Sequence, residues 1–261
     1  MPETDLALLE DAARASGEIA KSFFQSSPET WDKGGNDGPV TEADLAIDKM
    51  LRAELVGNRT DYGWLSEESE DDEARLACER VFIVDPIDGT RAFIAGEKTF
   101  AHSLAIARNG AVVAAAVYLP VMDLMYLADL EHETTLNGDA INVGANAQID
   151  GATVLASKQN LEPKYWDGDV PPIKRKFRPS LAYRLSLVAQ GRFDAMMTIR
   201  PCWEWDIAAG DLIVRQAGGR TSDCLNGALT FNAAHPKTKG CLAANAQLHA
   251  ALQSRLKSNV P

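Results

Sequence analysis

The sequence predicts an α+β fold with two β-sheets and helices around them. Helical periodicity opens the chain, a block of apolar runs of strand length follows, and helices and strands alternate again after residue 150. This alternation is too loose for a doubly wound parallel sheet, and the 261 residues contain no internal repeat. A chain of this length can bury a substantial core in one domain or in two closely packed halves.

The first helix is expected to begin at Thr4 and Asp5, whose side chains can cap its first turn, because apolar residues recur at helical spacing directly after them. A polar, glycine-rich loop is expected over residues 26–38. The second helix is expected to begin near Thr41 and Asp44 and to continue through the apolar positions that follow them.

Apolar runs bounded by turn residues predict the strands of the first sheet. Asn109-Gly110 lies between two of these runs, which is a strong hairpin signal, and Asn137-Gly138 predicts a second turn. The expected strands cover residues 62–65, 81–84, 102–107, 111–119 and 124–128.

The second half of the chain is expected to begin near residue 151, which divides it into an N-terminal subdomain, 1–150, and a C-terminal subdomain, 151–261. Prolines discourage long regular structure between residues 163 and 179. The expected elements are a strand at 152–157, a helix at 180–190, a strand at 193–199, a helix at 206–217, a strand at 240–244 and a helix at 246–257.

The composition argues against two classes of protein. A net charge of −11 argues against a nucleic-acid-coating surface or an anionic membrane partner, although bound metals can reverse the local potential for an anionic substrate. No apolar stretch reaches the roughly 20 residues that span a bilayer, and the acidic start differs from a secretory signal, so a cytoplasmic protein is expected. The four cysteines and four histidines show neither disulfide-like nor zinc-like spacing.

The segment Asp-Pro-Ile-Asp-Gly-Thr at residues 85–90 carries the strongest chemical signal. It places Asp85 and Asp88 three residues apart where an apolar strand should end. Two carboxylates in a partly buried site either share a proton or are held ionised by a cation, and hard divalent cations prefer oxygen ligands. The alternative reading is an ordinary strand-end turn rich in Asp and Gly.

Three further segments favour the catalytic reading. They are Val40-Thr41-Glu42-Ala43-Asp44 at a helix start, Ser66-Glu67-Glu68-Ser69 after a short strand, and Trp205-Asp206-Ile207-Ala208-Ala209-Gly210 at another helix start. Taken singly, each is more often a helix cap, a solvated loop or a packing segment. In their order and spacing, the four segments resemble the inositol monophosphatase superfamily of magnesium-dependent, lithium-sensitive phosphatases.

This resemblance covers nearly the whole chain and implies a layered α-β-α-β-α sandwich that assembles as a homodimer. It also implies two to three Mg²⁺ ions at the junction of the two subdomains. The first metal site would use Glu67, Asp85 and the backbone carbonyl of Ile87. The second would use Asp85, Asp88 and Asp206, with Asp85 bridging the two ions.

The resemblance further implies how water is activated. A third, weakly held ion would lie by Glu67 with help from Asp44 through water, and Thr90, paired with Thr41 or Asp44, would position the attacking water. Divalent ions lower the pKa of bound water and neutralise charge on a transferring phosphoryl group. Direct attack by water, with no phosphoenzyme, is therefore expected.

The substrate is expected to be a small phosphomonoester. Asp-Gly-Thr-Arg at residues 88–91 and the position of Arg184 resemble the bacterial 3′(2′),5′-bisphosphate nucleotidases of sulfate assimilation, so adenosine 3′,5′-bisphosphate is the first choice. Arg184 would grip the second phosphate, while Trp203 either faces the ligand or packs in the core. The substrate-binding residues expected are Asp88, Gly89, Thr90, Arg184, Glu204 and Asp206.

Three alternatives remain open. Inositol 1-phosphate is the second choice of substrate and histidinol phosphate the third, because the shared metal ligands do not discriminate among them. A non-catalytic protein that keeps the fold and binds RNA or transcription machinery is the alternative from another class. The acidic ligand set is complete, which argues against that alternative.

Overall fold

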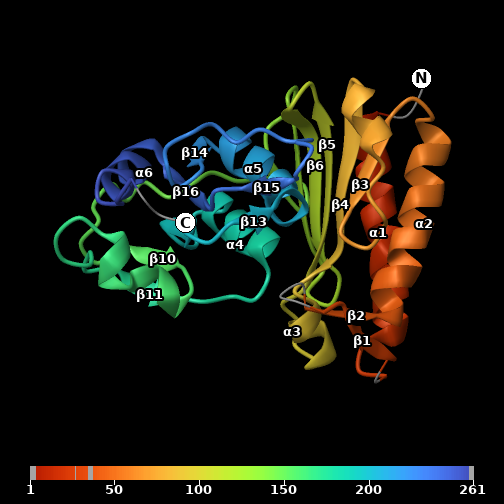
Figure 1. The fold of residues 1–261 in the computed structure, drawn as a ribbon, viewed down its shortest axis with the longest axis horizontal. Helices are drawn as coiled ribbons and strands as arrows, with labels where there is room; N and C mark the ends of the chain where they lie inside the picture. The colour runs from red at the N-terminus through yellow and green to blue at the C-terminus, as the bar shows by residue number, and fades with distance from the viewer. Residues whose placement is uncertain (1–3, 27, 35–37, 259–261) are drawn as a thin grey trace.

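The computed structural model describes residues 4–26, 28–34 and 38–258, and its elements form five layers (Figure 1). Two long helices make the first layer. Thr4 caps the first of them by accepting a hydrogen bond from the amide of Ala7, as expected. Apolar side chains of both helices, including Leu9 and Ile47, are buried against the neighbouring sheet. These helices are α1 (Asp5–Phe23) and α2 (Glu42–Asn58).

The second layer is a seven-stranded sheet with the order β3-β4-β5-β6-β7-β8-β9. Strands β3 and β4 are parallel, and the other neighbours are antiparallel. The predicted hairpin at Asn109-Gly110 joins β5 to β6, and both residues have positive φ, as such turns require. The strands are β3 (Gly63–Ser66), β4 (Arg80–Asp88), β5 (Ala101–Arg108), β6 (Ala111–Leu119), β7 (Leu124–Asp129), β8 (Thr135–Leu136) and β9 (Asp139–Ala140).

The third layer consists of α4 (Leu181–Ala189) and α5 (Glu204–Gln216), which cover the other face of this sheet. Gly210 allows the two helices to approach each other closely, because a Cβ atom there would lie 2.4 Å from the side chain of Leu185. The contact matters for function because each helix begins beside the acidic residues described below.

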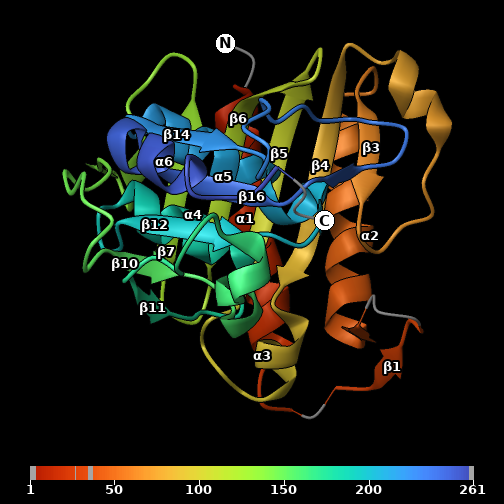
Figure 2. The ribbon, with the colours of Figure 1, turned by 60° about the vertical axis from the view of Figure 1, so that its left-hand side comes forward.

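A five-stranded mixed sheet with the order β11-β10-β12-β16-β14 forms the fourth layer, and α6 (Ala246–Gln253) packs on its outer face (Figure 2). The predicted layered α-β-α-β-α sandwich is thereby confirmed. The strands are β10 (Thr153–Leu155), β11 (Lys174–Lys176), β12 (Ala195–Thr198), β14 (Gly219–Ser222) and β16 (Cys241–Asn245).

Several short elements were not expected, and each lacks a clear apolar pattern. Within the expected loop at 26–38, β1 is exposed along its length and pairs with β2, while positions 27 and 35–37 lie outside the described residues. The predicted helix at 206–217 begins two residues earlier. The remaining elements are β1 (Thr30–Asp32), β2 (Pro39–Thr41), η1 (Glu73–Ala77), α3 (Thr90–Ile94), η2 (Lys158–Leu161), η3 (Pro163–Tyr165), β13 (Cys202–Trp203) and β15 (Lys237–Thr238).

The two sheets use different parts of the chain. The larger one is built from residues 63–140 and the smaller one from residues 153–245. The division into subdomains at residue 150 stays a prediction. None of the helices in the described ranges is long and apolar enough to cross a membrane.

Candidate active site

The segment at residues 85–90 ends strand β4 and begins α3. The ladder between β4 and β5 is regular as far as Asp85 and shifts register before Asp88, so the chain bends between the two carboxylates. Gly89 then adopts a φ of 97°, a left-handed conformation that favours glycine. The bend brings both aspartates and the start of α3 to one side of the sheet edge.

His102 stabilises this bend through a contact with the backbone. Its Nδ1 lies 2.5 Å from the carbonyl oxygen of Pro86, which can only accept, so Nδ1 carries the proton. Burial lowers the pKa of His102 to about 4, so the imidazole stays neutral. His102 is therefore a structural donor that fixes the turn.

Asp85, Asp88 and Asp206 converge at this edge, and one carboxylate oxygen from each lies within 4.8 Å of the other two. Asp85 and Asp88 are buried and Asp206 is half-buried. Burial and the neighbouring carboxylates raise the pKa of Asp85 and Asp206 well above the ordinary value, and burial raises the pKa of Asp88 to about 6. Three like charges this close are unfavourable without a cation.

A divalent cation fits this carboxylate set. Asp85 Oδ1 is buried and has no hydrogen-bond partner among the described residues, although buried carboxylate oxygens are normally paired. An oxygen-only donor set of this kind matches the preference of hard divalent ions. The structure therefore brings together three of the residues expected to hold metal, and their ligand roles stay predictions.

Asp88 also connects the sheet to α4. Its Oδ2 accepts hydrogen bonds from the Ser180 hydroxyl at 2.7 Å and from the Ala182 amide at 2.6 Å. These two bonds hold one carboxylate oxygen at the N-terminus of α4, where negative charge is favourable. The orientation of the whole carboxylate is thereby fixed before any ligand binds.

Asp206 lies in the first turn of α5, and its Oδ2 accepts a hydrogen bond from the amide of Trp203. Glu204, expected to bind substrate, does not line the pocket. Its buried carboxylate instead accepts hydrogen bonds from the amides of Asn232 and Ala233, at 2.6 and 3.0 Å. The expectation for Glu204 is therefore corrected to a structural role, since both of its oxygens are used within the fold.

Trp203 also packs within the protein. Its ring stacks on Trp205 at a centroid distance of 4.6 Å, and Lys237 Nζ lies 3.7 Å from the ring centroid on a cation–π contact. Trp203 is absent from the residues that line the pocket. Of the two alternatives for this indole, the structure favours packing over contact with a ligand.

Glu67 follows strand β3, beside β4, and lines the same pocket. Lys33 forms ion pairs with this residue and its neighbour, because its Nζ lies 2.8 Å from Glu67 Oε1 and 2.6 Å from Glu68 Oε1. Burial and the charge of Glu67 raise the pKa of Glu68 to about 7, an effect that Lys33 opposes. Sequence reasoning missed Lys33, because its loop has no pattern that ties it to the acidic pair.

Thr41, Asp44 and Thr90 form a hydrogen-bonded group beside the carboxylates. The Thr41 hydroxyl and amide both donate to Asp44 Oδ2, in a capping box that begins α2. The Thr90 hydroxyl lies 3.0 Å from the carbonyl oxygen of Ile87 and 3.3 Å from Asp44 Oδ1. The residues expected to position water are thus in mutual contact, and their catalytic role stays a prediction.

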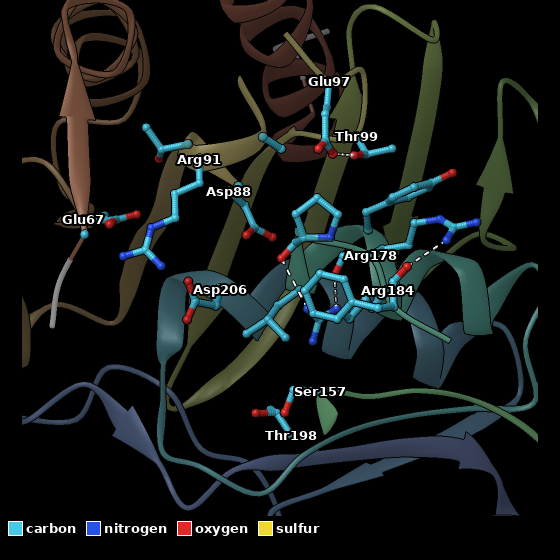
Figure 3. Close-up of a pocket in the computed structure, with 18 of the residues that line it drawn as sticks. Glu67, Asp88, Arg91, Glu97, Thr99, Ser157, Arg178, Arg184, Thr198 and Asp206 are labelled. Atoms are coloured by element: carbon cyan, nitrogen blue, oxygen red, sulfur yellow. Dashed lines mark hydrogen bonds between the residues drawn. The ribbon is translucent and has the colours of Figure 1, made fainter. Parts of the chain in front are cut away.

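These groups open into a cavity of about 980 Å³. In Figure 3, Asp88 and Asp206 face the same space, with Glu67 and Arg91 beyond them and Arg178 and Arg184 on the other side. Among the described residues, none of the lining arginines has a carboxylate within 4.0 Å. The five arginines are Arg91, Arg178, Arg184, Arg192 and Arg200.

Arg184 is the most constrained of them. It is 5% exposed, its Nε donates to the carbonyl oxygen of Arg178, and its guanidinium stacks on Phe177 at 4.5 Å. Burial lowers its pKa to about 10, so the side chain remains charged at neutral pH. The structure places Arg184 in the pocket as expected, while sequence reasoning missed Arg178, Arg192 and Arg200.

Replacing Glu204 tests its corrected role. Glu204→Gln is expected to lower the free energy of unfolding by about 1–3 kcal/mol, because one acceptor oxygen becomes a donor that faces a backbone amide. Substrate preference should not change. Urea denaturation and KM values would measure both effects, with the exposed Glu79→Gln as a matched control. Unchanged stability with a raised KM would restore the substrate-binding role.

Comparisons with known proteins agree with this site. A family model described as "Inositol monophosphatase family" matches residues 1–260. An inositol-1-monophosphatase of Rhizobium meliloti is 33% identical over 224 residues, covering 82% of this chain and 83% of the relative. Nus factor SuhB of Escherichia coli is 31% identical over 252 residues, covering 90% and 92%.

Solved structures show the same relationship. The crystal structure of extragenic suppressor protein suhB from Bartonella henselae superposes with a TM-score of 0.79 and 26% identity, covering 95% of this chain and 96% of that chain. The match therefore extends over nearly the whole fold. This chain belongs to the inositol monophosphatase family of metal-dependent phosphatases.

Proposed function

We propose that this protein is a Mg²⁺-dependent phosphomonoester hydrolase that uses water directly as the nucleophile. Asp85, Asp88, Asp206 and Glu67 would hold two to three ions together with the Ile87 carbonyl. Bound Mg²⁺ supplies an activated water and neutralises charge on the phosphoryl group. The buried, unpaired oxygen of Asp85 and the raised pKa values of the cluster support this assignment.

The protein's own side chains would orient the attacking water. The Thr90 hydroxyl has one proton, and the Ile87 carbonyl and Asp44 both lie within reach of it. When the proton is donated to either of them, a lone pair on Thr90 Oγ1 faces away to accept a hydrogen bond from water. Thr41 fixes Asp44 through two hydrogen bonds, so the direction of that lone pair is constrained.

For the substrate, we propose adenosine 3′,5′-bisphosphate, hydrolysed to AMP and phosphate. The observation that carries this choice is the set of five lining arginines, none of which is paired with a carboxylate in the described ranges. One scissile phosphate beside the carboxylate cluster does not need five cations. A leaving group with its own phosphate would engage the arginines on the side of Asp88 and Asp206 that lies away from Glu67, with Arg184 first among them.

Inositol 1-phosphate is the second candidate, because a relative 33% identical to this chain is named an inositol-1-monophosphatase. Its leaving group is uncharged and would leave most of the arginines without a partner. Phosphate release from adenosine 3′,5′-bisphosphate, inositol 1-phosphate and histidinol phosphate tests the choice. A kcat/KM for the adenosine compound no higher than that for inositol 1-phosphate would overturn it.

Arg184→Gln should separate these candidates. Loss of a charged hydrogen bond costs about 1.5–3 kcal/mol, so kcat/KM for adenosine 3′,5′-bisphosphate should fall about 10- to 100-fold, mostly through KM. Hydrolysis of inositol 1-phosphate by the same variant should change much less. The exposed Arg220→Gln serves as the control for removal of a positive charge. Equal losses on both substrates would show that Arg184 has only a structural role.

Three other properties belong to the same proposal. They are assembly as a homodimer, inhibition by lithium in the presence of Mg²⁺, and action in the cytoplasm. The complete carboxylate set supports an enzyme over a binding protein that merely keeps the fold. RNA binding without any Mg²⁺-dependent phosphate release would favour the latter.

A further inference from the structure

The charge of this protein is distributed very unevenly along the chain. Residues 171–200 contain seven lysines and arginines and one carboxylate, Asp194, which gives this stretch a net charge of +6 in a chain of −11. Asp194 accepts hydrogen bonds from the amide and the hydroxyl of Thr153, so it serves the fold. We call this stretch the basic band; its cations are Lys174, Arg175, Lys176, Arg178, Arg184, Arg192 and Arg200.

The basic band has an inner part and an outer part. Its last four arginines line the pocket, whereas its first three cations form β11, where all three residues are exposed. Strand β11 is an edge strand of the smaller sheet. Within the part of the chain that the structure describes, no carboxylate lies within 4.0 Å of any of the seven.

The outer part leads directly to the mouth of the pocket. The carbonyl of Lys176 accepts a hydrogen bond from the amide of Ala156, and the next residue, Ser157, lines the pocket. Phe177, which follows β11, also lines the pocket, and the residue is 48% exposed. In Figures 1 and 2, the chain passes from β11 at the sheet edge toward α4.

This arrangement fits a ligand longer than a mononucleotide. Lys174 and Lys176 lie on the same side of β11, because alternate residues of a strand share one face, and their charges repel each other unless an anion lies over them. A phosphodiester chain supplies regularly spaced anions. One face of the Phe177 ring is covered by the Arg184 guanidinium, and the exposed part of the ring offers a stacking surface for a base, as aromatic rings do in the basic grooves that bind single strands. A partner protein with an acidic surface has no bases, so it would not need an aromatic ring for stacking.

We propose that the enzyme also removes the terminal 3′-phosphate from short single-stranded oligoribonucleotides, with the phosphodiester chain lying along β11. The inference rests on the proposed function, because the last nucleotide of such a chain is a nucleoside 3′,5′-bisphosphate whose 5′-phosphate continues into the strand. The water oxygen forms a bond to phosphorus as the bond from phosphorus to O3′ breaks. O3′ receives a proton, and inorganic phosphate leaves.

Charge reversal on β11 tests the binding step. The variant K174E/R175E/K176E changes only the outer part, and K49E/R52E/K239E reverses three exposed cations elsewhere with the same change in net charge. Fluorescence anisotropy with a labelled, 3′-phosphorylated five-nucleotide RNA should give a Kd at least tenfold higher for the β11 variant than for the control variant. The salt slope should fall by about 1.4, at about 0.7 per phosphate contact in a single strand for each of Lys174 and Lys176.

Activity distinguishes this inference from the function on which it rests. The ratio of kcat/KM for the 3′-phosphorylated RNA to that for adenosine 3′,5′-bisphosphate should fall at least tenfold in the β11 variant and stay constant in the control. Equal effects of the two variants, or equally strong competition by polyglutamate, would overturn the inference. Hydrolysis of the mononucleotide without hydrolysis of the RNA would refute the inference alone, and no hydrolysis of either would refute the proposed function.

Discussion

Asp88→Asn is expected to lower kcat by at least about a hundredfold while leaving the fold intact. The substitution removes one of three clustered negative charges, and metal-based charge stabilisation contributes several kcal/mol, with each 1.36 kcal/mol corresponding to a tenfold change in rate. An asparagine oxygen can still accept the hydrogen bonds from Ser180 and the Ala182 amide, so the link to α4 should survive. Phosphate release and circular dichroism would measure these two outcomes.

The exposed Asp139→Asn provides a matched control for Asp88→Asn, because it makes the same chemical change outside the carboxylate cluster. The metal-free Asp88→Asn protein should be more resistant to urea than the metal-free wild type, since one source of carboxylate repulsion is gone. Loss of helical signal in Asp88→Asn would show instead that the residue is mainly structural.

The stability of the metal-free protein is expected to fall as pH rises from about 4 to about 7. Burial and neighbouring carboxylates raise the pKa of Asp85, Asp88 and Asp206 in the folded state, to about 6 for Asp88, whereas the ordinary value for Asp is about 3.9. The folded state therefore binds more protons than the unfolded state in this range, and ionisation costs stability. The stabilisation from these three carboxyl groups is greatest below pH 4. It is lost as the pH rises through their pKa values in the folded state.

Urea denaturation in a chelator at pH 4.5, 6.0 and 7.5 would measure this dependence. The expected change in the free energy of unfolding is on the order of 1–3 kcal/mol for Asp88, whose pKa burial raises to about 6. Adding Mg²⁺ at pH 7.5 should restore stability, and Asp206→Asn should flatten the profile. A metal-free protein whose stability rises from pH 4.5 to 7.5, or a flat profile in the wild type, would contradict the prediction.

Much of the fold was predictable because its central elements carry strong local signals. Strands β4 to β7 are apolar runs between turn residues, and the hairpin at Asn109-Gly110 needs positive φ at both positions. Strand β11 and the exposed strand β1 could not be predicted in the same way. Both are short and polar, and their pairing depends on which strand of the same chain the tertiary fold places beside them.

The site was predictable where one segment fixes its own geometry. The spacing of Asp85 and Asp88 requires only the end of a strand and a turn, and the structure brings Asp206 to them. The prediction that Glu204 binds substrate was wrong for a local reason. Residues two apart on a helix point to nearly opposite sides, so Glu204 and Asp206 at the start of α5 could not both face the cavity.

Tertiary partners explain what sequence reasoning missed. Lys33 lies 34 residues before Glu67, and no periodicity connects them. The net charge of −11 argued against a nucleic-acid-coating surface and concealed the basic band at residues 171–200. A running charge count along the chain would have found the band, although it would not have shown that four of its arginines meet at the pocket.

The contacts of Glu204 also have a consequence for cooperativity. Glu204 holds the amide of Asn232, and the side chain of Asn232 accepts a hydrogen bond from buried Arg75, which belongs to the N-terminal half. Hydrogen bonds therefore connect the first turn of α5 to residues in both halves of the chain. Neither half can keep the acidic centre assembled by itself, so hydrolysis and tertiary structure should disappear at one common denaturant midpoint.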